Sequence, residues 1–138
     1  MVKSQTGVEK LNMSTTTVQR NMEERADKDI ECDLISASCI ETVVKKYPVV
    51  VFSKPWCPYC KRAIEALSIE GVTKPYIVDL ASFGPKGPAI QDTLQKITGR
   101  RTVPNVFIGG NSIGGGDETT AMQREGKLGP LLKTVGAL

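Results

Sequence analysis

Residues 49–60 read VVVFSKPWCPYC and join two kinds of sequence pattern. The apolar and largely β-branched run Val49–Ser53 predicts a buried strand. Apolar residues then recur at helical spacing from Cys60 through Ala63, Ile64 and Leu67. Two cysteines separated by two residues therefore stand where a strand ends and a helix begins, which is an arrangement typical of a redox-active thiol pair.

The sequence after residue 33 alternates between helical and strand patterns. Helices are expected at 34–46, from the cysteine pair to residue 70, and at 88–97, 117–124 and 128–135; further strands are expected at 76–78, 106–108 and 112–113, and a loop at 81–88. Strand, helix and strand in succession predict a right-handed parallel crossover, and the turn Gly109-Gly110 predicts an antiparallel hairpin. The sequence therefore predicts an α/β fold with a four-stranded mixed sheet flanked by helices.

The composition limits the chemistry that the chain can perform. It has 138 residues, no histidine and a formal net charge of +3. Without histidine, Ser-His-Asp catalysis, Cys-His catalysis and His-containing zinc sites are excluded. We expect no nucleic-acid partner, because the Lys/Arg clusters of such a module are lacking. We expect no membrane partner, because the apolar stretches are far too short to span a bilayer.

Residues 1–32 are rich in polar and charged residues and poor in large apolar ones. Such a composition cannot form a core, so we expect a disordered extension ahead of a folded domain at 33–138. The Ser14–Thr17 tract with nearby basic residues weakly resembles a mitochondrial transit peptide, but the acidic residues between 23 and 29 argue against one. We expect a cytoplasmic protein, with mitochondrial import as the alternative.

Two further cysteines, Cys32 and Cys39, lie outside the Cys-X-X-Cys motif. A secreted disulfide framework is not expected, because residues 1–12 contain no apolar signal segment. A zinc site made of all four cysteines is not expected either, because the spacing of this second pair is unlike that of a structural zinc knuckle. We predict that Cys39 packs in the core and that Cys32 is an adventitious thiol near the extension.

Four features, Lys54, Cys57-Pro58-Tyr59-Cys60, Thr102-Val103-Pro104 and Ile113–Asp117, together resemble the motifs of the dithiol glutaredoxins. Cys57-Pro58-Tyr59-Cys60 resembles their most typical active-site sequence, and Lys54 lies three residues ahead of it. Thr102-Val103-Pro104 resembles their Thr-Val-Pro segment, whose proline is cis. Ile113–Asp117 resembles their glutathione-binding glycine turn, with Gly116 where relatives often have Cys or Ser. The resemblance covers about residues 34–138 and implies a thioredoxin-like fold.

Cys57 is the expected nucleophile. Its sulfur would lie beside the free N–H groups at the start of the helix, which stabilise a thiolate, and Lys54 would add positive charge. Attack on a disulfide gives a mixed disulfide, which Cys60, one turn deeper, would resolve when the partner is a protein. The alternative role for two cysteines at this spacing is a structural or metal-binding pair.

The resemblance also implies a glutathione site. The turn Gly115-Gly116-Asp117 would receive the γ-glutamyl end of glutathione, and the backbone of Val103 would pair with the peptide. Gln91 and Arg101 match family positions that contact the glycyl carboxylate. Arg100 is assigned only a general positive field. The remaining residues expected to bind substrate are Lys54, Tyr59, Thr102 and Pro104.

The expected function is glutathione-dependent reduction of glutathione mixed disulfides and protein disulfides by a monomer. Glutathione is the expected co-substrate, glutathionylated or disulfide-containing proteins are the expected partners, and no metal is expected. One alternative is a carrier of a [2Fe–2S] cluster, which Pro58 disfavours in the family. A second alternative is a thioredoxin-type reductase, which the Pro58-Tyr59 pair and the glycine turn disfavour.

Overall fold

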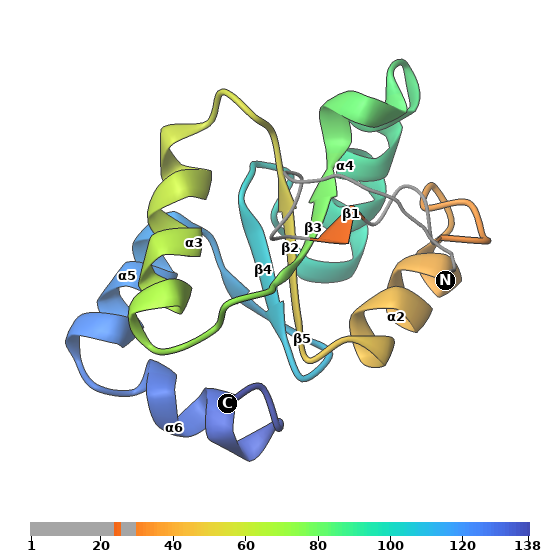
Figure 1. Cartoon of the computed structure of the whole chain (residues 1–138). Helices are drawn as coiled ribbons and strands as arrows, with labels where there is room; N and C mark the ends of the chain where they lie inside the picture. Colours follow the sequence, from red (N-terminus) through yellow and green to blue (C-terminus); the bar gives the residue numbers. More distant parts are fainter. Residues whose placement is uncertain (1–23, 26–29) are drawn as a thin grey trace, which may run out of the picture.

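The protein is described by a computed structural model that covers residues 24–25 and 30–138 (Figure 1). Five strands form one mixed sheet in the order β1-β3-β2-β4-β5. Strand β2 pairs in parallel with β3 and antiparallel with β4, and β5 pairs antiparallel with β4. The strands are β1 (Glu24–Arg25), β2 (Val49–Ser53), β3 (Tyr76–Asp79), β4 (Asn105–Ile108) and β5 (Asn111–Gly114).

Helices cover both faces of this sheet. In Figure 1, α3, α5 and α6 lie on one side of the sheet, and α2 and α4 lie on the other. In the part of the chain that the structure covers, no helix is long and apolar enough to cross a membrane. The helices are α2 (Ala37–Lys46), α3 (Pro58–Ile69), the 3-10 helix η1 (Leu80–Phe83), α4 (Lys86–Thr98), α5 (Gly116–Arg124) and α6 (Leu128–Thr134).

The central strand β2 contributes to a hydrophobic core on each face. Val50 and Phe52 pack among residues of α2 and α4. Val49 and Val51 point the other way and pack among residues of α3 and α6. Because both faces are covered, the strand is an almost unbroken apolar run, and it carries the chain directly to the Cys-X-X-Cys motif.

The predicted α/β class with a thioredoxin-like, four-stranded mixed sheet is confirmed in strands β2–β5. The fifth strand, β1, is a two-residue addition that pairs in parallel with the edge of β3, Glu24 opposite Tyr76. Its residues fall within the segment 1–32, for which disorder was expected. Residues 1–23 and 26–29 of that segment lie outside the described residues, and the expected extension stays a prediction.

The expected loop at 81–88 is wrong in its boundaries. The 3-10 helix η1 occupies its first part, capped by Asp79, whose Oδ1 accepts a hydrogen bond from Ala81 N at 2.9 Å. Helix α4 begins at Lys86, so Pro88 lies inside its first turn. Backbone N–H groups in a first turn have no partner within the helix, and a proline there costs no hydrogen bond.

Cys32 and Cys39 form a disulfide, so the prediction of an unpaired Cys32 thiol is wrong. The chain turns sharply between them, where Asp33 O accepts from Ser36 N at 2.9 Å and Asp33 Oδ1 accepts from Ile35 N at 3.0 Å. This turn brings Cys32 against the first turn of α2. Cys39 is buried in the core, as expected.

Candidate functional site

Cys57 is the N-cap residue of α3. Its backbone is extended, with φ −90° and ψ 113°, and its Sγ accepts a hydrogen bond from Cys60 N at 3.2 Å. Pro58 occupies the first helical position, where its fixed φ suits the helix and its missing N–H leaves no donor unused. The sulfur therefore faces the donors at the start of the helix.

Cys60 is the deeper of the two thiols, with only 2% of its surface exposed. Burial is the main cause that raises the pKa of its thiol to about 12, and the hydrogen bond with Cys57 is the second. Neither Cys57 nor Cys60 forms a disulfide in this structure. Cys60 is therefore a neutral, shielded thiol at neutral pH, within reach of the Cys57 sulfur.

The loop before β4 approaches Cys57 from the opposite side. The Val103–Pro104 peptide bond is cis, as the resemblance implied. The Cys57 thiol lies 3.7 Å from Val103 O, with the thiol as donor. Two segments far apart in the sequence thus meet at the sulfur atom.

The glycine turn lies against the start of α3. A Cβ added at Gly116 would lie 2.7 Å from Tyr59 O, which is too close for any side chain without movement of the backbone. The glycine lets the first residue of α5 pack directly on the backbone of Tyr59 without such a movement. The start of α5 and the Cys-X-X-Cys segment are therefore in contact.

Gln91 and Arg101 lie together, beside the loop that carries Val103. Gln91 is buried, and its Nε2 donates to Arg101 O at 3.1 Å. The Arg101 Nε donates to Asp92 Oδ1 at 2.8 Å, and both side chains of this ion pair are well exposed. Gln91 thus holds the backbone of the arginine, while Asp92 orients its guanidinium group.

The exposed rim around Cys57 is aromatic and basic. Trp56 is 69% exposed and Tyr59 is also exposed. The Arg62 guanidinium lies 5.0 Å from the centre of the Tyr59 ring. Asp117 and Arg62 line one cavity of about 360 Å³ next to the glycine turn. The Lys54 backbone carbonyl accepts from Cys57 N at 3.2 Å.

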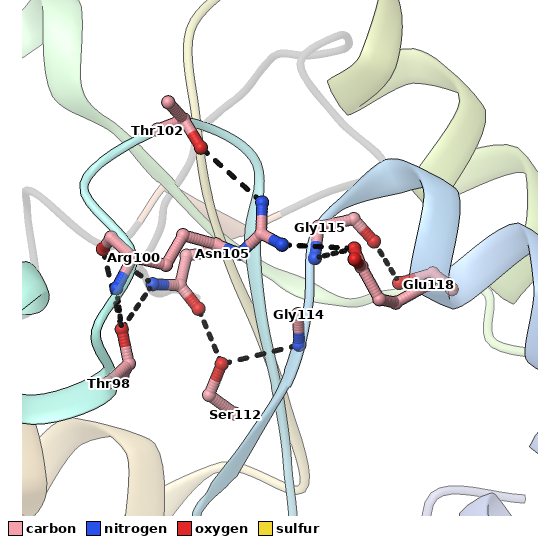
Figure 2. Close-up of polar contacts among 9 residues, drawn as sticks. Thr98, Arg100, Thr102, Asn105, Ser112, Gly114, Gly115 and Glu118 are labelled. Atoms are coloured by element: carbon pink, nitrogen blue, oxygen red, sulfur yellow. Dashed lines mark hydrogen bonds and ion pairs between the residues drawn. The ribbon is translucent and has the colours of Figure 1, made fainter.

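The sequence did not reveal the role of Arg100. Its Nη2 lies 3.1 Å from Glu118 Oε1, so its charge is paired rather than a general positive field, which corrects the sequence interpretation. The same Glu118 oxygen accepts from Gly115 N at 2.8 Å (Figure 2). A glutamate three residues after a helix N-cap is the sequence signal that points to this contact.

These features together define a class of protein. The central strand of a mixed sheet leads into a Cys-X-X-Cys motif at a helix N-terminus, and a loop with a cis proline faces the first sulfur. This is the arrangement of the thioredoxin-fold thiol–disulfide proteins.

The chain belongs to the glutaredoxin family, whose family model, "Glutaredoxin", matches residues 49–113. It is 50% identical over 97 residues to Glutaredoxin-C2 of Arabidopsis thaliana, covering 70% of this chain and 85% of that relative. It is 48% identical over 104 residues to a glutaredoxin of Solanum lycopersicum, covering 75% of this chain and 94% of that relative. The predicted family and enzyme class, a glutathione-dependent oxidoreductase, are thus confirmed.

Solved structures agree with this assignment. Oxidized glutaredoxin 2 from Chlamydomonas reinhardtii matches with a TM-score of 0.67 at 42% identity, covering 74% of this chain and 94% of that chain. A buckwheat glutaredoxin–glutathione complex matches with a TM-score of 0.68 at 41% identity, covering 74% of this chain and 91% of that chain.

Proposed function

We propose that this chain reduces glutathione mixed disulfides and protein disulfides, with Cys57 as nucleophile, Cys60 as resolving cysteine and glutathione as reductant. The observation that carries the proposal is the position of Cys57 Sγ, which accepts the Cys60 N–H at 3.2 Å at the start of α3. Backbone donors and the helix dipole favour negative charge at this position, and a thiolate is the form that attacks a disulfide.

The monothiol reaction has two exchanges. The Cys57 thiolate attacks the glutathione sulfur of a glutathionylated protein, forming a Cys57–glutathione disulfide and releasing the protein thiolate. A second glutathione thiolate then attacks that disulfide at the glutathione sulfur. This step returns the Cys57 thiolate and forms oxidised glutathione, so two glutathione sulfurs carry away the oxidation.

A protein disulfide follows the dithiol reaction. Attack by Cys57 gives a protein mixed disulfide, and Cys60 then attacks the Cys57 sulfur, releasing the reduced protein and forming a Cys57–Cys60 disulfide. Cys60 must lose its proton for this step. Once Cys57 is in a disulfide, the hydrogen bond and charge through which Cys57 raises the pKa of Cys60 are gone. Burial still raises this pKa, and the hydrogen bonds with Lys54 and Ser53 lower it.

Glutathione would bind across the two segments that meet near Cys57. The Gly116 and Asp117 end of the turn would take its γ-glutamyl group, and Val103 would pair with the peptide backbone. Gln91 and Arg101 would face the glycyl carboxylate of glutathione. To bind this carboxylate, the exposed Arg101 guanidinium would either leave Asp92 or contact both groups at once. A related buckwheat glutaredoxin has been solved as a complex with glutathione, which supports glutathione as the ligand.

The rim would meet the rest of a protein substrate. The exposed Trp56 and Tyr59 offer apolar contact area next to the reacting sulfur, and Lys54 would add positive charge at the same edge.

The test is glutathione-coupled reduction of a small glutathione mixed disulfide by three forms of the chain. The wild type should be active, Cys57→Ser should lose all activity, and Cys60→Ser should keep it, because the monothiol reaction does not use Cys60. A protein disulfide substrate should need both cysteines.

A matched control is Cys39→Ser, combined with Cys32→Ser, which removes the same kind of atom far from the motif. This variant should retain the activity of the folded wild type. Activity that survives in Cys57→Ser would show that the assigned nucleophile is wrong.

A further inference from the structure

Arg100 lies between the two segments that would bind glutathione, yet it has no role in the reaction described above. Its Nη1 donates to Thr102 Oγ1 at 3.3 Å, on the loop that leads to the cis proline. Its Nη2 pairs with Glu118 Oε1 at 3.1 Å, in the first turn of α5. One guanidinium thus spans from the loop to the helix that follows the glycine turn (Figure 2).

Glu118 completes this connection to the backbone of the turn. Its Oε1 accepts both the Arg100 guanidinium and Gly115 N, the latter at 2.8 Å. The hydrogen bond from Gly115, assisted by the charge of Arg100, lowers the pKa of Glu118, so the carboxylate is ionised at neutral pH. Because Glu118 occupies Gly115 N, the donors that remain toward a ligand are those of the next residues of α5.

The backbone at Gly115 packs closely against Arg100 and Pro104. A Cβ added at Gly115 would lie 2.6 Å from Arg100 Nη1 and 3.2 Å from Pro104 O. The backbone of the turn therefore rests on the guanidinium and on the carbonyl of the cis proline at the same point. A shift of the glycine turn would therefore displace the loop that carries Arg100 and Pro104, and the reverse.

A second connection ties the backbone of Arg100 to the same turn. Asn105 is fully buried, and its Nδ2 donates to Thr98 Oγ1 at 3.2 Å and to Arg100 O at 3.4 Å. Its Oδ1 accepts from Ser112 Oγ at 2.7 Å, and Ser112 Oγ accepts from Gly114 N at 3.3 Å. Figure 2 shows these contacts as a chain that runs from the end of α4 to the glycine turn.

We propose that Arg100 and Glu118 are positioning residues for glutathione. Their ion pair fixes the distance between the Val103 backbone and the N–H groups of Gly116 and Asp117. This inference rests on the proposed function, in which glutathione binds both segments at once. A ligand that must contact two separate backbone segments binds more tightly when their separation is set beforehand. The pair contributes through this geometry, without touching the reacting sulfur.

The test is a double-mutant cycle with Arg100→Met and Glu118→Gln. Arg100→Met should raise the KM for glutathione about tenfold with kcat within about twofold, Glu118→Gln should raise it about threefold, and the double variant should resemble Arg100→Met alone, because interacting residues do not contribute additively. Calorimetric titration of reduced glutathione into the same variants should show the same order of affinities.

The Glu118→Gln variant separates positioning from simple attraction. Glutathione is anionic, so removing a negative charge would by attraction alone lower its KM, whereas loss of the positioning contact raises it. Lys127→Met is the matched control, because Lys127 forms an exposed ion pair with Glu125 at 3.2 Å outside the site. It should leave the KM within about twofold of the wild-type value.

The outcomes are distinct. An inactive wild type would contradict the proposed function itself. An active wild type with unchanged KM in both variants, a KM lowered by Glu118→Gln, or additive effects in the double variant would overturn the positioning role. If Arg100→Met does not fold, as judged by its melting temperature, Glu118→Gln alone decides, because its neutral amide oxygen can still accept from Gly115 N.

Discussion

At the scale of single residues, both active-site thiols are buried, with 8% of Cys57 and 2% of Cys60 exposed, and Cys60 is the deeper of the two. Cys60 lies beneath Cys57 with almost no exposed surface, and its raised pKa of about 12 keeps its proton in place at neutral pH. A neutral thiol is a poor nucleophile, so Cys60 does not compete with Cys57 for an incoming disulfide. It reacts only after the mixed disulfide places a sulfur leaving group directly above it.

This difference predicts the alkylation behaviour of Cys60. In a chain with Cys32→Ser, Cys39→Ser and Cys57→Ser, the remaining Cys60 thiol should react with iodoacetamide at pH 7 at least about a hundredfold more slowly than after unfolding in urea, because burial suppresses the thiolate. Mass spectrometry of timed samples measures both rates. Equal rates in the folded and unfolded protein would contradict the buried, protonated state.

The starts of α3 and α5 touch at the scale of secondary-structure elements. Gly116 rests on Tyr59 O, and this contact holds the glycine turn beside the cysteine motif. A side chain at Gly116 must push one helix start away from the other, because Tyr59 O is a backbone atom and not the end of a flexible side chain.

Gly116→Ala should therefore lower the free energy of unfolding by about 1–3 kcal/mol, measured by urea denaturation. Gly129→Ala is the control, because it is also a helical glycine whose added Cβ would approach within 2.7 Å, but the neighbouring atom is the flexible Glu70 Oε1. The control should be neutral or slightly stabilising, because alanine favours the helix. Equal stability of Gly116→Ala and wild type would show that α5 moves freely.

Local patterns predicted most of the elements and only part of the site. Strand β2 and the position of Cys57 at the start of α3 follow from neighbouring residues, because a strand buried on both faces and a helix N-terminus each have a local signature. The Arg100–Glu118 pair joins a loop to a helix across the β4–β5 hairpin, and no periodicity records such a contact. The Cys32–Cys39 bond was missed because it depends on the turn at Asp33, which the helical pattern from residue 34 concealed.

At the scale of the whole molecule, a disulfide fastens the segment before α2 to the core that α2 and α4 form on one face of the sheet. Cys39 belongs to that core, whereas Cys57 and Cys60 lie at the start of α3. The chain thus combines one disulfide-bonded pair of cysteines, Cys32 and Cys39, with one pair of free thiols, Cys57 and Cys60. We expect the disulfide to stabilise the fold and the two free thiols to react with substrate.

Removing the bond by Cys32→Ser with Cys39→Ser should lower the free energy of unfolding by about 2–3 kcal/mol, because a cross-link over a short loop restricts the unfolded chain. Urea denaturation without reductant measures the loss. The comparison is made in a Cys57→Ser, Cys60→Ser background, so that a Cys57–Cys60 disulfide cannot contribute to the midpoint. Identical midpoints with and without Cys32→Ser and Cys39→Ser in that background would contradict the stabilising role.

The rim residue Trp56 has an optical consequence. It is the chain's single tryptophan, it is largely exposed, and it directly precedes Cys57. Nearly all the long-wavelength fluorescence of this protein therefore comes from the residue that precedes the reacting cysteine in the sequence. A disulfide formed near an indole ring quenches its emission. The intensity of Trp56 fluorescence should therefore fall when Cys57 forms a disulfide and rise when the disulfide is reduced. Stopped-flow fluorescence of the unlabelled protein measures both steps.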